Sequence, residues 1–215
     1  MKLVIQLLLW IVIIFLGYLV FNAVYDPIKF NKVKEKRYAK VIERLGDIRA
    51  AQLAHNEITG TFEKDFDKLI KFVDTAKFVI TQRRDTTYLD AEYRKTYGVD
   101  QYKEDIVVDT LGFSSVKDSL FKNSDRYKEM MNIPIDGVKE KFEMNAGFVE
   151  KNDVKFPVFE AKVNKGVILY DQDKDLVMQE KQVQSVEFVR GEYIRVGSME
   201  EVNTKGNWPT IYGGN

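Results

Sequence analysis

The chain has 215 residues, of which 45% are hydrophobic and 13% aromatic, and its 33 basic residues balance 33 acidic ones. A disordered polyelectrolyte is strongly charged and poor in aromatic residues, so this composition excludes that class. The chain contains no cysteine and one histidine, His55. Disulfides, thiolate zinc sites, iron–sulfur clusters, cysteine nucleophiles and multi-histidine metal sites are therefore excluded.

The amino-terminal segment is apolar over a length that suits a membrane span. No charged residue occurs from Leu3 to Val24, and about 20 apolar residues in a helix cross a hydrocarbon core of about 30 Å. A cleaved secretory signal has a shorter apolar core and small residues before its cleavage site, whereas the bulky Phe21 stands at one of those positions here. We expect residues 1–25 to form an uncleaved transmembrane anchor in the lipid bilayer. A cleaved signal and a buried soluble helix remain as alternatives.

The charges beside this segment conflict about the orientation of the chain. Six basic residues lie between positions 29 and 40, against Lys2 alone before the span, and the positive-inside rule would place the bulk of the chain in the cytoplasm. A minimal amino-terminal tail beginning Met-Lys is instead typical of bacterial signal anchors, which export the part of the chain after the span. Together with the β-rich remainder, it favours a single-pass protein of the bacterial inner (cytoplasmic) membrane whose bulk is periplasmic.

An amphipathic juxtamembrane helix is expected over residues 26–57. Asp26-Pro27 predicts a kink or short break, because proline lacks an amide donor and disfavours helix at the preceding residue. The helix itself is expected from about Ile28 to about Asn56, with Thr59-Gly60-Thr61 ending it. Its apolar stripe can pack on the chain's own sheet or on copies of itself in a bundle, and both remain open. The stripe comprises Val33, Tyr38, Val41, Leu45, Ile48 and Ala51.

Residues 58–215 are expected to form an α+β extracytoplasmic domain with an antiparallel sheet. Period-two alternation predicts a hairpin of strands 142–147 and 157–163 around a turn at Lys151-Asn152-Asp153. The polar stretch Arg83 to Gln101 is expected to be an extended loop, which is long enough to be an interaction surface or to hide a short helix. The remaining expectations are a helix from Asp65 to Asp74, strands at Ala76–Gln82, Asp105–Phe113 and Val167–Tyr170, a second hairpin of Val186–Val189 with Tyr193–Val196, and a coil tail, Gly206–Asn215, with Trp208 docked on the sheet.

The end of the long helix resembles that of type IV pilins and type II secretion pseudopilins. Ala51-Gln52-Leu53-Ala54-His55, Thr59-Gly60-Thr61-Phe62 and the short helix after them are similar to a family pattern of Ala-Gln-x-Ala-Tyr, an Asn-Gly-x-Tyr turn and a short helix. Pro27 is similar to the proline that kinks the pilin helix. The resemblance implies a pilin-like fold and a role in assembly.

The resemblance covers about a third of the chain, roughly Pro27 to Val73, and it does not include the prepilin peptidase motif. A prepilin has a basic leader ending in glycine and a glutamate five residues into the mature chain, whereas no acidic residue precedes Asp26 here. The carboxyl-terminal part, especially Val186 to Tyr212, also resembles uncharacterised membrane-anchored proteins of bacteroidete bacteria, which implies no activity.

One segment has the spacing of a metal site. Asp171, Asp173 and Asp175 present alternate carboxylates, as calcium prefers. An EF-hand loop starting at Asp171 would need a glycine and a glutamate where Leu176 and Gln182 stand, so a solvated acidic turn is the favoured interpretation, with a calcium site as the alternative.

No other pattern indicates chemistry. His55 lies at a helix end without a nominated nucleophile, and no phosphate-binding or dinucleotide-binding glycine motif occurs. The balanced charge and the membrane anchor argue against nucleic acid as a partner. We therefore expect no catalytic, cofactor-binding or metal-binding residue, no cofactor and no enzymatic activity.

The leading hypothesis is a structural or assembly component of a bacterial envelope machine, pilin- or pseudopilin-like, whose partners are other cell-envelope proteins or copies of itself contacted through the amino-terminal helix. The alternative is a membrane-tethered module that binds a ligand or partner through the Arg83–Gln101 segment. A membrane-bound hydrolase is a third, weaker hypothesis.

Overall fold

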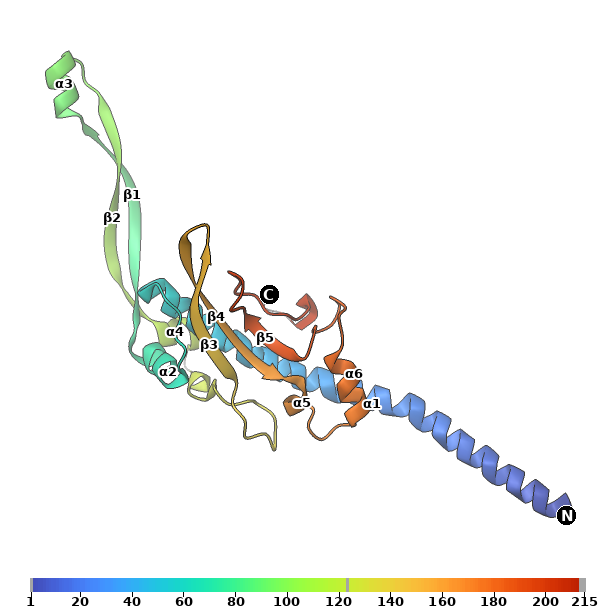
Figure 1. The fold of residues 1–215 in the computed structure, drawn as a ribbon. Coiled ribbons are helices and arrows are strands. Elements are labelled where there is room, and N and C mark those ends of the chain that lie inside the picture. The colour runs from blue at the N-terminus through green and yellow to red at the C-terminus, as the bar shows by residue number, and fades with distance from the viewer. Residues whose placement is uncertain (1, 123, 213–215) are drawn as a thin grey trace.

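The computed structural model of the protein describes residues 2–122 and 124–212. It divides into a long helix of residues 2–59, a projecting arm of residues 77–115, and a body formed by the other described residues (Figure 1). The fold is α+β with antiparallel sheets. Met1 of the expected anchor and residues 213–215 of the expected coil tail lie outside the described residues. The helices are α1 (Lys2–Thr59), α2 (Phe66–Thr75), α3 (Ala91–Tyr97), α4 (Val116–Phe121), α5 (Lys165–Ile168), α6 (Lys174–Lys181) and the 3-10 turns η1 (Arg126–Glu129) and η2 (Thr210–Tyr212). The strands are β1 (Lys77–Leu89), β2 (Tyr102–Ser115), β3 (Glu143–Lys151), β4 (Val154–Asn164) and β5 (Tyr193–Gly197).

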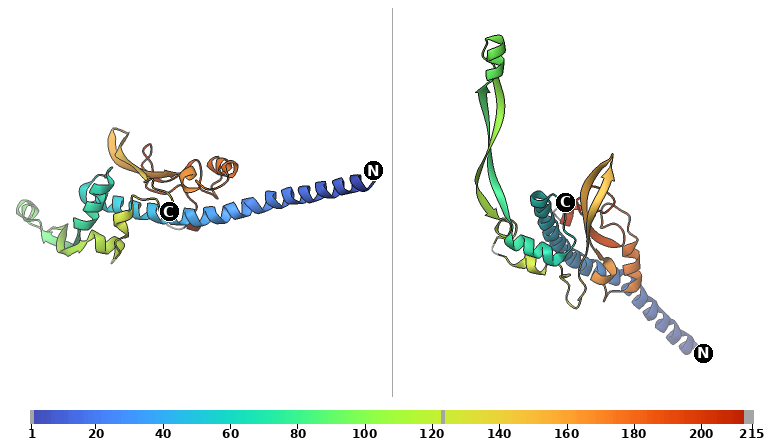
Figure 2. Two further views of the ribbon diagram at one scale, coloured as in Figure 1. Left: turned by 90° about the horizontal axis from the view of Figure 1, so that it is seen from below. Right: turned by 60° about the vertical axis from the view of Figure 1, so that its left-hand side comes forward.

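The expected anchor and the expected juxtamembrane helix are one helix. α1 has 58 residues and continues through Pro27, so the predicted break is wrong, and Figure 2 shows a gradual bow instead. Proline removes one backbone hydrogen bond, but the turns on either side keep theirs and hold the helix together. The predicted end is confirmed: Gly60 takes a positive φ of 76°, and its amide donates to the Asn56 carbonyl at 2.8 Å.

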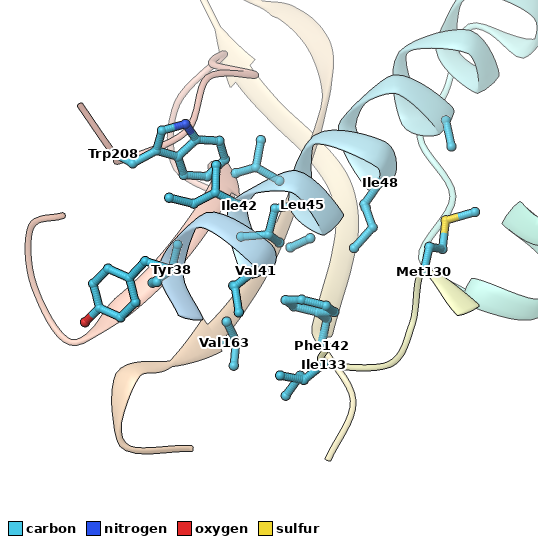
Figure 3. Close-up of a cluster of buried hydrophobic side chains, with 14 of the residues drawn as sticks. Tyr38, Val41, Ile42, Leu45, Ile48, Met130, Ile133, Phe142, Val163 and Trp208 are labelled. Atoms are coloured by element: carbon cyan, nitrogen blue, oxygen red, sulfur yellow. The ribbon is translucent and has the colours of Figure 1, made fainter. Parts of the chain in front are cut away.

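The apolar stripe of α1 packs inside the chain's own body. Tyr38, Val41, Leu45 and Ile48 are each at most 1% exposed. Val41 and Ile48 lie toward Phe142, whereas the Tyr38 ring points away from it (Figure 3). All four belong to the same core of buried side chains. The alternative of a bundle formed through this stripe is therefore excluded, because the stripe is already covered. The core that includes it also contains Ile42, Met130, Ile133, Phe159, Ala161, Val163, Ile194, Val196 and Trp208.

The three-stranded sheet has the order β3-β4-β5, all antiparallel. The predicted hairpin is confirmed, with Lys151 opposite Val154 and positive φ angles of 53° and 62° at Asn152 and Asp153. Two central residues with positive φ are what a two-residue hairpin turn requires, because that backbone twist matches the twist of the strands. The docking of Trp208 is also confirmed: its side chain is 3% exposed.

Two predicted strands are wrong. Val167–Tyr170 overlaps helix α5, which begins after Asn164, whose side chain caps the Gly166 amide at 2.8 Å. A short apolar run has no periodicity that separates strand from helix. Val186–Val189 is not a strand, and its expected hairpin mate, β5, pairs with β4 instead. Strand pairing is decided by tertiary packing, which local patterning does not report.

The predicted loop Arg83–Gln101 is wrong as well, because most of it is regular structure, but the alternative of a hidden short helix is confirmed by α3. The first residues complete β1, residues 91–97 form α3, and β2 begins at Tyr102. The predicted strands Ala76–Gln82 and Asp105–Phe113 lie almost entirely within these longer strands. β1 and β2 form a two-stranded antiparallel sheet of their own, which projects away from the body (Figures 1 and 2).

Candidate interaction surfaces

The amino-terminal part of α1 is an apolar surface that the protein does not cover. Its large apolar side chains, from Leu3 to Tyr25, are between 46% and 76% exposed. Among the described residues, α1 is the one helix long and apolar enough to cross a bilayer. A helix that is apolar on all sides and free of the body is unstable in water. The segment is thus a candidate membrane anchor or signal sequence.

A buried ion cluster joins α1 to the body just beyond this segment. The Lys34 ammonium donates to Glu180 Oε2 at 2.9 Å, and the Tyr38 hydroxyl donates to Oε1 at 3.3 Å. Lys165, whose side chain is 0% exposed, donates to Oε1 at 3.2 Å and to the carbonyls of Glu180 and Val189 at 2.7 and 2.8 Å. All the donors of Lys165 are satisfied, so the cluster is a structural link between α1, α5 and α6.

The protonation of this cluster follows from its burial. Burial lowers the pKa of the Lys165 ammonium, although Glu180 opposes that effect. Burial also raises the pKa of the Tyr38 hydroxyl, and the neighbouring Glu180 carboxylate raises it further. Tyr38 therefore remains a neutral donor at any ordinary pH.

The three aspartates with calcium spacing do not converge. Asp171 forms a bidentate ion pair with Arg37 of α1, with distances of 2.5 and 2.8 Å, and the Arg37 guanidinium holds the pKa of that carboxyl well below its usual range. Asp173 caps helix α6, accepting from the amides of Asp175 and Leu176. The described residues contain no group of three or more His, Asp or Glu side chains that could hold a metal ion. The favoured sequence interpretation, an acidic turn, agrees with these contacts.

The residues that resemble the pilin motif make structural contacts at the end of α1. The fully buried Gln52 side chain forms two hydrogen bonds with the backbone of Glu63. It donates to the Glu63 carbonyl at 2.5 Å and accepts from the Glu63 amide at 3.0 Å. His55 Nδ1 lies 2.6 Å from the Thr61 carbonyl oxygen and 3.0 Å from Thr59 Oγ1. These contacts hold the chain as it turns back along the helix toward α2. Among the described residues, no carboxylate forms a hydrogen bond with His55 that would orient the ring for catalysis.

A polar hollow on the body has a volume of about 530 Å³ and lies over β4 and β5. It is lined by three cations, Lys162, Arg190 and Arg195, and by two carboxylates, Glu160 and Glu192. Glu160 pairs with Lys162 at 2.9 Å and with Arg195 at 3.1 Å. The side chains that line this hollow form no arrangement of catalytic groups.

The arm is the second uncovered surface. Most residues of β1 and β2 are exposed, on both faces, and nine of their apolar side chains are 40% to 67% exposed. These nine are Val79, Ile80, Tyr88, Tyr102, Ile106, Val107, Val108, Leu111 and Phe113. A lone two-stranded ribbon is at best marginally stable in water, so this arm is a candidate for covering by another protein surface.

The tip of the arm is well defined. Asp90 accepts from the amides of Glu92 and Tyr93 at 3.1 Å, which starts α3, and Lys103 of β2 holds the same carboxylate at 2.7 Å. Gly98, with a φ of 69°, ends the helix. This aspartate cap and terminal glycine are a helix signature that is readable in the sequence, and they give the bounds of the short helix that was expected as an alternative within Arg83–Gln101.

No family model, curated protein or solved structure matches the chain. The resemblance to pilins therefore stays a prediction. The sequence singled out the apolar segment and the Arg83–Gln101 stretch as surfaces. It did not anticipate the ion cluster, whose members lie up to 146 positions apart.

Proposed function

We propose that this protein is a non-enzymatic structural or assembly component of a bacterial envelope machine, held in the inner membrane by one transmembrane segment with its bulk in the periplasm. The observation that carries the proposal is the single helix α1, which is apolar and uncovered over its first part and buried in the body over its second. Because α1 is one continuous helix, a shift or rotation of its membrane segment moves the body with it.

The pilin-like version of this proposal assigns assembly to the uncovered part of α1. The order of parts supports it: an apolar amino terminus continues into a long helix that packs on an antiparallel sheet. Because the stripe from Tyr38 to Ala51 is buried in the body, apolar contacts between copies through α1 are left to its exposed amino-terminal part. Small residues such as Gly17 and Ala23 allow close helix approach there.

Anchoring and orientation are tested together with single cysteines, because the chain has none of its own. We expect the full chain to resist extraction from membranes with alkaline carbonate. A Glu57→Cys variant, exposed near the end of α1, should react with a membrane-impermeant maleimide from the periplasmic side of intact cells. Labelling only after lysis would place the body in the cytoplasm, as the basic flank suggests. A mature chain beginning after residue 22 would show that the segment is a cleaved signal.

The assembly role is tested by crosslinking in native membranes. We expect amine-reactive crosslinkers to capture dimers or complexes with other envelope proteins. A chain that remains monomeric and without partners at its natural abundance would contradict the scaffold proposal.

The second candidate function is a membrane-tethered binding module, and the projecting arm favours it. Residues 83–108 can be replaced by an Asn-Gly turn that joins Gln82 to Asp109, which oppose each other in the hairpin. Because the removed residues are exposed and outside the core, the body should keep its stability. The variant should lose one specific partner, and an unchanged set of crosslinked partners would exclude the arm as the recognition surface.

A further inference from the structure

The two edges of the arm differ in their capacity to accept another strand. On β2, the register passes from Ile80 opposite Gly112 to Thr81 opposite Thr110, so Leu111 is an extra, bulged residue. Bulges and clustered charges are the devices that discourage strand addition at a sheet edge. The β2 edge also carries three carboxylates, at Glu104, Asp105 and Asp109.

The β1 edge lacks these devices. From Thr81 to Leu89 it pairs with β2 without interruption, and it contains no proline. Its charges are mixed, with Arg83 and Arg84 beside Asp85. A regular, exposed edge strand with both faces uncovered is a template for a further strand.

The β1 sequence is complementary to itself when two copies run antiparallel and are centred on Arg84. In that register Arg83 of one copy lies opposite Asp85 of the other, and the same pair recurs on the far side of the centre. Opposite charges placed directly across a sheet stabilise strand pairing, as do paired threonines and paired apolar side chains. The other opposed pairs are Thr81 with Thr87, Ile80 with Tyr88, and Val79 with Leu89.

The central residue does not oppose this arrangement. Arg84 meets Arg84 of the second copy, but each is already ion-paired with Asp109 of its own arm. The two neighbouring registers are less favourable. A register centred on Arg83 places the two Arg83 side chains opposite each other, and one centred on Asp85 does the same for the two Asp85 side chains. Like charges directly opposite each other destabilise a strand pair.

We propose that β1 of this chain pairs antiparallel with β1 of a second copy, giving a four-stranded sheet of order β2-β1-β1-β2 with a two-fold axis at Arg84. The inference rests on the proposed assembly role and names one partner for it. The pairing closes the regular edge of each arm and leaves the bulged, acidic β2 edges outside. It is an isologous contact, in which the same surface is used by both copies.

Cysteine scanning of the detergent-solubilised full chain tests the register, since every disulfide formed must come from an introduced residue. Arg84→Cys is the self-opposed position, with Cα atoms about 4.5–5.5 Å apart, so mild oxidation should convert it to a covalent dimer. Gln82→Cys and Thr86→Cys alone should not, because like residues would be about 14 Å apart along the strand. A mixture of these two variants should form the heterodimer, since position 82 opposes position 86.

The matched control is Val107→Cys, which lies opposite Arg84 in the arm but on the β2 edge. It should remain monomeric. Dimers of Val107→Cys, equal dimers at all the scanned positions, or no dimer of Arg84→Cys would each overturn the proposal. Unchanged far-ultraviolet circular dichroism and Trp208 emission show that a variant has folded.

Charge exchange tests the same pairing without a covalent bond. Arg83→Asp should weaken dimerisation about tenfold, because it sets two aspartates against each other at both symmetric positions. Adding Asp85→Arg should restore the dimer by exchanging the two signs. Reversal at Glu104→Arg, on the outer edge, is the control and should change nothing. Failure of the double variant to recover would overturn the register.

The outcomes for the inference and for the proposed function are separable. If Arg84→Cys dimerises but the chain is washed from membranes by carbonate, the membrane-anchored role fails and the pairing stands. If the chain is anchored and crosslinks to other proteins while Arg84→Cys stays monomeric in detergent and in membranes, the pairing fails alone.

Discussion

Glu180→Gln removes the carboxylate that neutralises the buried ion cluster between α1, α5 and α6. Lys165 then holds its ammonium at 0% side-chain exposure without an anion, and Lys34, at 11%, loses its ion-pair partner. Removing one partner of a buried pair destabilises a protein by about 3–5 kcal/mol. Lys165 keeps two carbonyl acceptors, at 2.7 and 2.8 Å, so we expect about 3 kcal/mol, the lower end of that range.

The loss of unfolding free energy caused by Glu180→Gln should depend on pH. Burial already lowers the pKa of Lys165, and loss of the Glu180 carboxylate lowers it further. A lysine whose folded pKa lies below its unfolded value of about 10.4 destabilises the folded state fully below the folded pKa, and the penalty shrinks as pH rises through it. The loss of stability caused by Glu180→Gln should therefore decrease as pH rises above 7 toward the unfolded lysine pKa of about 10.4. The buried Tyr38 hydroxyl, whose pKa is raised, opposes folding only above the unfolded tyrosine pKa of about 10.

Urea unfolding of the detergent-solubilised full chain measures these quantities. Trp208 reports on the core, and a Trp10→Phe background removes the other tryptophan. Glu192→Gln is the matched control, because that carboxylate pairs with Lys181 on the surface, and it should have no measurable effect. Adding Lys165→Met to Glu180→Gln should recover stability. If Glu180→Gln is as stable as the control, or if adding Lys165→Met lowers stability further, an unpaired buried charge is not the cause of the destabilisation.

Three further outcomes are expected from the packing. Gly197→Ala should destabilise the protein by about 2 kcal/mol or more, because φ there is 77° and an added methyl group would lie 2.2 Å from a backbone carbonyl oxygen of β4. Gly46→Ala has open space around the added methyl group and should stabilise the protein by about 0.5–1 kcal/mol. The urea midpoints of the two variants measure both effects. Leu45→Ala should cost about 2–5 kcal/mol, since the side chain is fully buried, and a loss under about 1 kcal/mol in the same assay would contradict its place in the core. The ion pair between Arg37 and Asp171 should contribute about 1 kcal/mol or less to the free energy of unfolding, because solvent screens it. Arg37 lowers the pKa of Asp171, so this contribution is present above about pH 4 and is lost as pH falls below that value. Urea unfolding of wild type and Asp171→Asn at pH 7 and pH 3 would measure the difference.

Local patterning predicted the elements whose environment is one-sided. The stripe of α1 and the hairpin of β3 and β4 each have one face on the core, so their apolar residues recur at the period of the element. The arm has no core face, and each of its faces carries both charged and apolar residues: Arg83 lies opposite Val108 on one face and Arg84 opposite Val107 on the other. The sequence therefore predicted only the parts of these strands within Ala76–Gln82 and Asp105–Phe113, and it missed the polar remainder of β1.

Residues close in sequence determined where this protein is apolar, where its long helix ends and which hairpin turns back on itself, because those features depend on composition and on neighbouring residues alone. Only the tertiary structure decided that the stripe of α1 is covered by the chain's own sheet, that β5 joins β4, and that Lys34, Lys165 and Glu180 meet. Such contacts depend on the balance between burial, charge and hydrogen bonding across more than a hundred residues of chain. No local pattern contains that balance.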